Sequence, residues 1–280
     1  MQNLKEFERP QSLDEAVEKI SAKPGRRLLA GGTGLSITDS KTTIGLVDLK
    51  SVGLDYIEDD SDAIKIGATA VMRALEESSL LQNYAGGLLA DVAAEVGTTP
   101  LRNMITAGGN ITQLRVWSDL PAPLLALDAE ILVTDQEGET TYPAQKFFHR
   151  HPSQLLDDTD IVTEIQLPRG IENYSSSYTK FVAVDDSYAV TSVSVVLDME
   201  GDTVKDVRIG VGSASPSPAR CPEAEEELVD AELNESLAEK VGEICRANVN
   251  TTDNVWGSGD YKSKLIEKLV KKNLLQAKTS

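Results

Sequence analysis

Two pairs of adjacent glycines, Gly31-Gly32 and Gly108-Gly109, constrain the fold of this chain more than any other feature. A predicted buried strand over residues 27–30 runs directly into the first pair, and a small polar residue, Thr106, stands just before the second. Glycine has no Cβ and adopts positive φ readily, so successive main-chain N–H groups can converge on an anion at close range. We therefore predict that the two loops, although far apart in the sequence, close on one pyrophosphate.

Neither loop matches the common nucleotide-binding motifs. The three spaced glycines of the dinucleotide fingerprint are missing, and neither pair is followed by the Gly-Lys-Ser/Thr ending of a nucleoside-triphosphate loop. The sequence therefore argues against a nucleotide hydrolase. Taken alone, Gly31-Gly32 also fits an ordinary tight turn.

Composition narrows the class of protein. A chain of 280 residues is long enough for two domains, or for one large domain with an appendage. A formal net charge of −18 argues against nucleic acid or an anionic membrane as partner. No apolar run reaches the roughly 18–20 residues of a membrane span. Residues 1–6 lack the layout of a signal peptide, which predicts a cytoplasmic protein. A high-salt source would explain the acidity equally well.

The potential metal ligands are few. Cys221 and Cys245 are the only cysteines, whereas an iron–sulfur cluster normally needs about four thiolates, so we expect no cluster on this chain. His149 and His151 are the only histidines and have no cysteine or carboxylate cluster beside them, which favours a loop or packing role over a metal site. We predict no metal site and two unpaired thiols.

Hydrophobic periodicity predicts the secondary structure of the first part of the chain. Ser12 and Glu15 form a capping-box pattern at the start of a helix, and Gly97 is placed to end a later helix. The other patterns predict strands at residues 6–10, 27–30, 44–49, 64–69, 131–134 and 161–167, and helices at 71–81, 84–96 and 124–127.

A change in composition at residues 168–177, rich in Gly, Asn and Ser, predicts a domain boundary. Beyond it, the pattern predicts three strands at residues 178–184, 191–199 and 204–211, a Ser- and Pro-rich loop at 213–222, and helices at 223–230, 237–249 and 261–275. Apolar residues of the last helix recur at helical spacing, which indicates a core face.

An ordered set of motifs closely resembles the FAD-binding medium subunit of the molybdenum hydroxylases, the relatives of xanthine dehydrogenase and carbon monoxide dehydrogenase. The motifs in the first part are Leu29-Ala30-Gly31-Gly32-Thr33, Gly97-Thr98-Thr99-Pro100-Leu101-Arg102-Asn103, Thr106-Ala107-Gly108-Gly109-Asn110, Ser118-Asp119-Leu120-Pro121-Ala122 and Leu124-Leu125-Ala126-Leu127-Asp128-Ala129. Those in the second part are Tyr178-Thr179-Lys180, Tyr188-Ala189-Val190 and Asp260-Tyr261-Lys262. The resemblance covers essentially the whole chain.

The resemblance implies an α+β fold with two main domains. A PCMH-type FAD-binding domain would span residues 1–170, with α/β subdomains at about 1–55 and 56–170. A flavoprotein C-terminal domain, with a three-stranded antiparallel sheet and a helical bundle, would span residues 175–280 and pack over the flavin ring.

The resemblance also implies non-covalent FAD, with the N–H groups of both glycine loops on the pyrophosphate. The corresponding positions are Leu29, Ala30, Gly31, Gly32, Thr33, Gly34, Leu35, Ser36, Gly97, Thr106, Ala107, Gly108, Gly109, Asn110 and Asp119, with Ile161 and Val162 near the ring. Asp119 is a hydrogen-bond acceptor when ionised, so a ribityl or ribose hydroxyl is its sensible partner. Valine at Gly108 or Gly109 is expected to abolish FAD binding in a folded chain.

The sequence departs from the family pattern in three respects. Gly34 stands where relatives often have Asp or Ser, and Val116 replaces a common Pro. Ala183 and Ser187 fall where relatives often have Arg and Asp, which affects the surroundings of the ring or the acceptor site.

The resemblance predicts an oxidoreductase subunit. It would take electrons from a partner iron–sulfur subunit onto FAD and deliver them to an acceptor such as NAD⁺, while a large partner subunit carries the molybdopterin. No catalytic side chain is required of this chain. Two alternatives remain: a stand-alone FAD-dependent oxidoreductase, and a structural subunit that has lost FAD.

Overall fold

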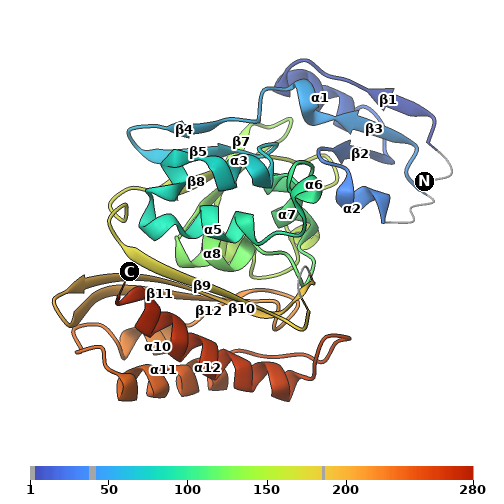
Figure 1. Cartoon of the computed structure of the whole chain (residues 1–280). Coiled ribbons are helices and arrows are strands. Elements are labelled where there is room, and N and C mark those ends of the chain that lie inside the picture. Colours follow the sequence, from blue (N-terminus) through green and yellow to red (C-terminus); the bar gives the residue numbers. More distant parts are fainter. Residues whose placement is uncertain (1–3, 38–41, 185–186, 280) are drawn as a thin grey trace.

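The strands of the chain form three separate sheets in the computed structural model, which describes residues 4–37, 42–184 and 187–279 (Figure 1). The sheets follow one another along the chain, with helices between the second and third sheets and beyond the third. The expectation of a cytoplasmic protein rests partly on residues 1–3, which lie outside the described residues. Within these same ranges, no helix combines the length and apolarity needed to cross a membrane.

The first sheet is parallel, in the order β1-β3-β2. Its elements are β1 (Glu6–Glu8), α1 (Leu13–Ser21), β2 (Arg26–Leu29), α2 (Thr33–Ser36), β3 (Gly45–Asp48) and η1 (Leu49–Ser51). The Ser12 hydroxyl caps α1 by accepting the N–H of Glu15 at 3.2 Å. The Glu15 carboxylate accepts the N–H of Gln11 at 2.8 Å, one residue before the position that the capping box predicts.

Arg26, on β2, links the two outer strands of this sheet through ion pairs with β1. Its buried guanidinium lies 2.7 Å from the Glu6 carboxylate and 3.1 Å from that of Glu8, and Lys23 lies 2.7 Å from Glu6. The hydrogen bonds from Lys23 and then Arg26 lower the pKa of Glu6 from 4.5 to about 2. The ionised carboxylate therefore stabilises the fold above pH 4.5, and this contribution is lost as the pH falls towards about 2.

Glu6→Gln is accordingly expected to lower the stability at neutral pH and to reduce the further loss of stability between about pH 4.5 and pH 2. Urea unfolding at several pH values measures both effects. Glu18→Gln, at an exposed position on α1, removes the same charge and serves as the control. Parallel pH profiles for Glu6→Gln and the parent chain would contradict the expectation.

The second sheet is antiparallel and, among the described residues, has five strands in the order β4-β5-β8-β6-β7. The strands are β4 (Ile57–Asp59), β5 (Ala63–Gly67), β6 (Glu130–Thr134), β7 (Glu139–Pro143) and β8 (Ile161–Pro168). The helices are α3 (Met72–Glu77), α4 (Ser79–Gln82), η2 (Ala85–Gly87), α5 (Leu88–Ala94), α6 (Thr99–Arg102), α7 (Ala107–Gln113), α8 (Pro121–Ala126), α9 (Ala144–Phe147) and η3 (Pro152–Gln154).

Two helices predicted in this part of the chain are shorter than expected. The helix predicted at 71–81 breaks at Ser78, which is extended and caps α4 through its hydroxyl on the N–H of Leu81. The helix predicted at 84–96 begins only at Leu88, because Gly86 and Gly87 are left-handed. A Cβ on Gly86 would lie 2.7 Å from the nitrogen of Ser176, so this turn lets the chain approach the third sheet closely.

The third sheet is antiparallel and has four strands within the described ranges, in the order β12-β11-β10-β9, where three strands were predicted. Its elements are β9 (Ser175–Val182), β10 (Ala189–Glu200), β11 (Thr203–Gly212), β12 (Ala219–Arg220), α10 (Pro222–Glu226), α11 (Glu235–Asn248) and α12 (Gly259–Ala277). The extra strand lies in the predicted loop at 213–222. It is only two residues long and forms because Arg220 pairs with Gly210 of β11.

β10 is buried on both faces, which joins the third sheet to the rest of the chain. Val193 and Val195 belong to the core beneath α11 and α12, whereas Val196 belongs to the central core under the second sheet. On β11, a Cβ at Gly210 would lie 2.2 Å from the carbonyl oxygen of Ala122. Glycine therefore allows α8 to lie directly against the sheet, and Figure 1 shows α12 on the opposite face.

Candidate functional site

The first glycine loop forms an open main-chain nest after β2. Gly32 is left-handed at φ +73° and precedes the first residue of α2, Thr33, so a left-handed residue is followed by a right-handed one. The N–H groups of Gly31, Gly32 and Thr33 donate to no acceptor among residues 4–37, 42–184 and 187–279. Three neighbouring donors without protein acceptors are the arrangement that an anionic oxygen needs.

The second glycine pair lies in the first turn of α7, and the N–H groups of this turn are already occupied. They donate within the protein, Ala107 to the carbonyl of Ala70 at 2.8 Å, Gly108 to the carbonyl of Ala68 at 2.8 Å and Gly109 to the Thr106 hydroxyl at 3.2 Å. The second loop therefore differs from the prediction that its N–H groups are available for a pyrophosphate.

The two glycines of this pair have different surroundings. A Cβ on Gly108 would lie 2.7 Å from the Cβ of Ala68 and 2.9 Å from its carbonyl oxygen, so Gly108 allows α7 to pack on the end of β5. A Cβ on Gly109 would meet only the Thr106 hydroxyl, at 2.8 Å, and is otherwise in open space. Gly109 is thus the glycine whose missing side chain leaves room for a ligand.

The two loops are in contact. A Cβ on Gly31 would lie 1.6 Å from the carbonyl oxygen of Met104, just before α7. A Cβ on Gly34 would lie 2.9 Å from the side chain of Gln113, the last residue of α7. The first loop and α2 therefore lie along α7. Gly97, at φ +48°, was predicted to end the helix before it, but α5 already ends at Ala94 with Glu95 as its C-cap, so this prediction is wrong. The Gly97 carbonyl instead accepts a hydrogen bond from the Arg102 guanidinium at 3.1 Å.

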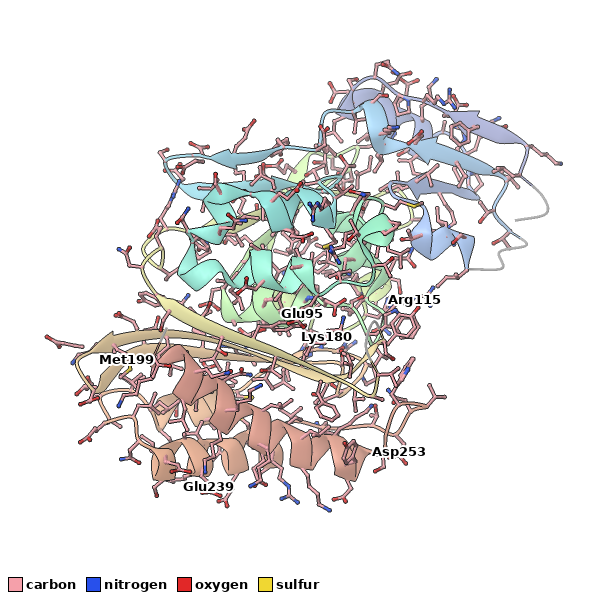
Figure 2. All side chains as sticks on the ribbon, viewed as in Figure 1. Glu95, Arg115, Lys180, Met199, Glu239 and Asp253 are labelled. Atoms are coloured by element: carbon pink, nitrogen blue, oxygen red, sulfur yellow. The ribbon has the colours of Figure 1, made fainter. Side chains whose placement is uncertain are left out.

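Asp119 is buried at the junction with the third sheet. Its Oδ1 lies 2.9 Å from Nζ of Lys180 on β9, and both side chains are less than a tenth exposed. Lys180 also donates to the carbonyl of Glu95 at 2.9 Å, and Figure 2 shows Glu95 and Lys180 together between the helices and the sheet. Burial raises the pKa of Asp119, and Lys180 opposes this shift.

Comparison with known proteins identifies the family. Residues 2–170 match the family described as the FAD binding domain in molybdopterin dehydrogenase, and residues 176–277 match the CO dehydrogenase flavoprotein C-terminal domain. The chain belongs to the molybdenum hydroxylase flavoprotein family.

Relatives in this family match along almost their whole length. The chain is 24% identical over 270 residues to the glyceraldehyde dehydrogenase medium chain of Sulfolobus acidocaldarius, covering 95% of each. It is 26% identical over 282 residues to the xanthine dehydrogenase FAD-binding subunit of Escherichia coli O157:H7, covering 97% of this chain and 95% of the relative. The carbon monoxide dehydrogenase structure from Hydrogenophaga pseudoflava superposes with a TM-score of 0.93 at 26% identity, covering 99% of this chain and 98% of that one.

The flavoprotein fold is thus established, and the residues present fit FAD. Unengaged N–H groups at Gly31, Gly32 and Thr33 suit a diphosphate, Gly109 on the neighbouring helix α7 faces open space, and Asp119 is a buried carboxylate that can accept a hydrogen bond from a hydroxyl. The chain contains no Asp or Glu between Glu95 and Asp119, so no acidic residue of this stretch repels the diphosphate.

Ile161 and Val162 occupy different cores of this flavoprotein. Ile161 is fully buried with α1 and β3, and Val162 is buried in the central core. Their side chains are therefore covered by protein, and any contact with a flavin would use main-chain atoms. The predicted contact of these two residues stays a prediction.

The structure brings together an aromatic cluster that sequence reasoning missed. Trp117, Tyr188 and Trp256 form one cluster, with ring centroids 4.6 Å apart for Trp117 and Tyr188, and 5.2 and 5.6 Å from these rings to Trp256. Tyr188 is about half exposed, at 49%. A resemblance motif contained Tyr188, but nothing in the sequence connected it to Trp256. Ala183 and Ser187 flank residues 185–186, which lie outside the described part of the chain.

Proposed function

We propose that this chain is the FAD-carrying electron-transfer subunit of a molybdenum hydroxylase. Electrons would arrive from a partner iron–sulfur subunit and leave to an acceptor such as NAD⁺, with molybdopterin on a large partner subunit. The observation that carries the proposal is the nest of three unengaged N–H groups at residues 31–33, in contact with the segment before α7. The relatives named as medium chains or FAD subunits support the proposed partners.

In this proposal, the residues of the chain bind and orient the cofactor. The first loop would hold the diphosphate, and Gly109 would leave room for it. Asp119, held in place by Lys180, would accept a hydrogen bond from a ribityl or ribose hydroxyl. Bound FAD would accept electrons singly and release them in pairs. The chain itself then needs no acid–base side chain, because it supplies position and electrostatics for the cofactor's chemistry.

The remaining assignments are proposals of the same kind. The FAD-binding domain would span residues 1–170, with subdomains at about 1–55 and 56–170. The C-terminal domain would span residues 175–280. A cytoplasmic location is proposed from the sequence alone. The FAD residues would include residues 29–36, 97, 106–110 and 119, with residues 161 and 162 contributing through the main chain.

Gly109→Val tests the site directly. Its side chain would enter the open space at Gly109, and we expect at least a roughly tenfold loss of FAD affinity. The fold should be retained, because the new Cβ would meet only the Thr106 side-chain hydroxyl, which can shift, and valine in a helix costs only about 0.5 kcal/mol relative to alanine. Flavin absorbance after reconstitution and circular dichroism measure the two quantities.

Ser79→Val places the same side chain on an exposed helical turn and controls for the cost of valine itself. Full FAD occupancy in Gly109→Val would show that the cofactor lies elsewhere. Failure of the parent chain to bind FAD under any reconstitution condition would overturn the proposed function and favour a structural subunit.

A further inference from the structure

A pocket of about 470 Å³ lies on the surface at α9 and η3 and contains none of the residues proposed for FAD. Its lining includes two cations, Lys146 and Arg150, together with His149 and Gln154. Phe147 and Leu155 contribute to its lining. A volume of this size is in the range of small-molecule sites, which combine an apolar surface with a few polar groups.

The charge of the pocket is opposite to that of the chain. The formal net charge of the chain is −18, yet the stretch between Glu139 and Asp157 contains no Asp or Glu and contains both histidines. Within the described ranges, neither Lys146 nor Arg150 lies within ion-pair distance of a carboxylate. The Lys146 ammonium lies 5.2 Å from the centre of the Tyr142 ring, a contact that leaves its charge in place.

The framework of the pocket is held in place by neighbouring contacts. Phe147 is fully buried and packs edge-on against Phe148, with centroids 5.2 Å apart and an interplanar angle of 89°. The Nδ1 atom of His151 accepts the N–H of Ser153 at 3.2 Å, while Nε2 lies 3.2 Å from the carbonyl oxygen of Gln113 and donates to it. These contacts hold η3, which carries Gln154, against α7.

We propose that this pocket binds the phosphate group of a small molecule whose apolar or aromatic part rests against the partly exposed Leu155. Lys146 and Arg150 supply two positive charges without carboxylate partners, and His149 and Gln154 supply further polar contacts. Because these side chains are exposed, the interaction is screened by water and salt. We expect a dissociation constant for inorganic phosphate on the order of 1 mM at low ionic strength.

The test is a titration of the FAD-loaded chain with inorganic phosphate, followed by NMR shifts of main-chain amides. FAD occupies the glycine loops, so shifts at residues 145–155 report this pocket alone. If the chain proves unable to bind FAD, the same titration remains informative, because shifts at residues 31–33 and 145–155 are separate. Failure of the proposed function and failure of the pocket are therefore distinguishable.

The variant Lys146→Gln/Arg150→Gln should weaken phosphate binding at least about tenfold and leave FAD occupancy unchanged. The control Lys5→Gln/Lys50→Gln removes the same charge from two other exposed lysines and should keep the parent affinity. An equal loss in both variants, or the absence of shifts at residues 145–155, would overturn the site.

ADP and adenosine test the lining. Tighter binding of ADP than of inorganic phosphate supports a ligand such as a nucleotide, whose aromatic part rests against Leu155. Equal affinity of ADP and phosphate would overturn that part of the proposal. If adenosine binds as tightly as ADP, then Lys146 and Arg150 do not bind a phosphate group, and the proposed role of these cations is overturned.

Discussion

Gly31→Ala is expected to lower the free energy of unfolding by about 3 kcal/mol and to abolish FAD binding. The added Cβ would lie 1.6 Å from the carbonyl oxygen of Met104 and 2.7 Å from its carbonyl carbon, so the main chain of one segment must move. That movement separates the first loop from the start of α7 and disturbs the N–H groups of residues 31–33. Urea unfolding and flavin absorbance measure the two effects.

Gly34→Ala is the matched control, because it makes the same change three residues later. The new Cβ would meet only the side chain of Gln113, at 2.9 Å, and a flexible side chain can shift. Alanine also favours a helical position by up to about 1 kcal/mol over glycine. We expect parent-like stability for Gly34→Ala. If Gly31→Ala unfolds at the same urea concentration as Gly34→Ala, the two loops do not touch as the structure places them.

Local sequence signals predicted the first loop well and the second loop incompletely. A strand running into two glycines is a local signal, and β2, Gly32 and α2 follow it directly. The state of the N–H groups of α7 depends instead on the carbonyls of Ala68 and Ala70, which come from a distant turn after β5. A glycine pair in the sequence does not show whether a distant carbonyl already accepts its N–H groups.

The different roles of Gly108 and Gly109 could not be predicted from the sequence for the same reason. The sequence predicted that valine at Gly108 would leave a folded chain, but Gly108 packs against Ala68 at distances that a side chain cannot fit. Gly108→Val is therefore a stability variant, and only Gly109 separates ligand space from packing. The difference between the two glycines arises from the tertiary contact of Gly108 with Ala68.

Contacts between the domains were also beyond sequence reasoning. Lys180 appeared only as part of a resemblance motif, and its place beside Asp119 depends on how β9 lies over α5. The two-residue strand β12 carries too short a pattern to predict, since its pairing with β11 defines it. Strong local patterns, such as the apolar spacing of α12, predicted their elements because those patterns are sufficient by themselves.

Lys180→Met is expected to destabilise the chain by about 3–5 kcal/mol near neutral pH, because it leaves the buried carboxylate of Asp119 without its cation. Burial already raises the pKa of Asp119 above its ordinary 3.8, and the loss of Lys180 raises it further. The folded variant then binds a proton that the unfolded chain does not bind. Its stability deficit should therefore be greatest above the folded pKa and shrink as the pH falls towards 3.8.

Unfolding in urea at about pH 8 and about pH 5 tests this dependence. Adding Asp119→Asn to Lys180→Met removes the unpaired charge, so the double variant should be more stable at pH 8 than Lys180→Met alone. Lys264→Met breaks an exposed ion pair with Asp260, 2.7 Å apart, and should change stability far less, because solvent screens that pair. Equal losses in Lys180→Met and Lys264→Met would mean that water reaches Asp119, and a hydroxyl of FAD would then compete with solvent for the carboxylate.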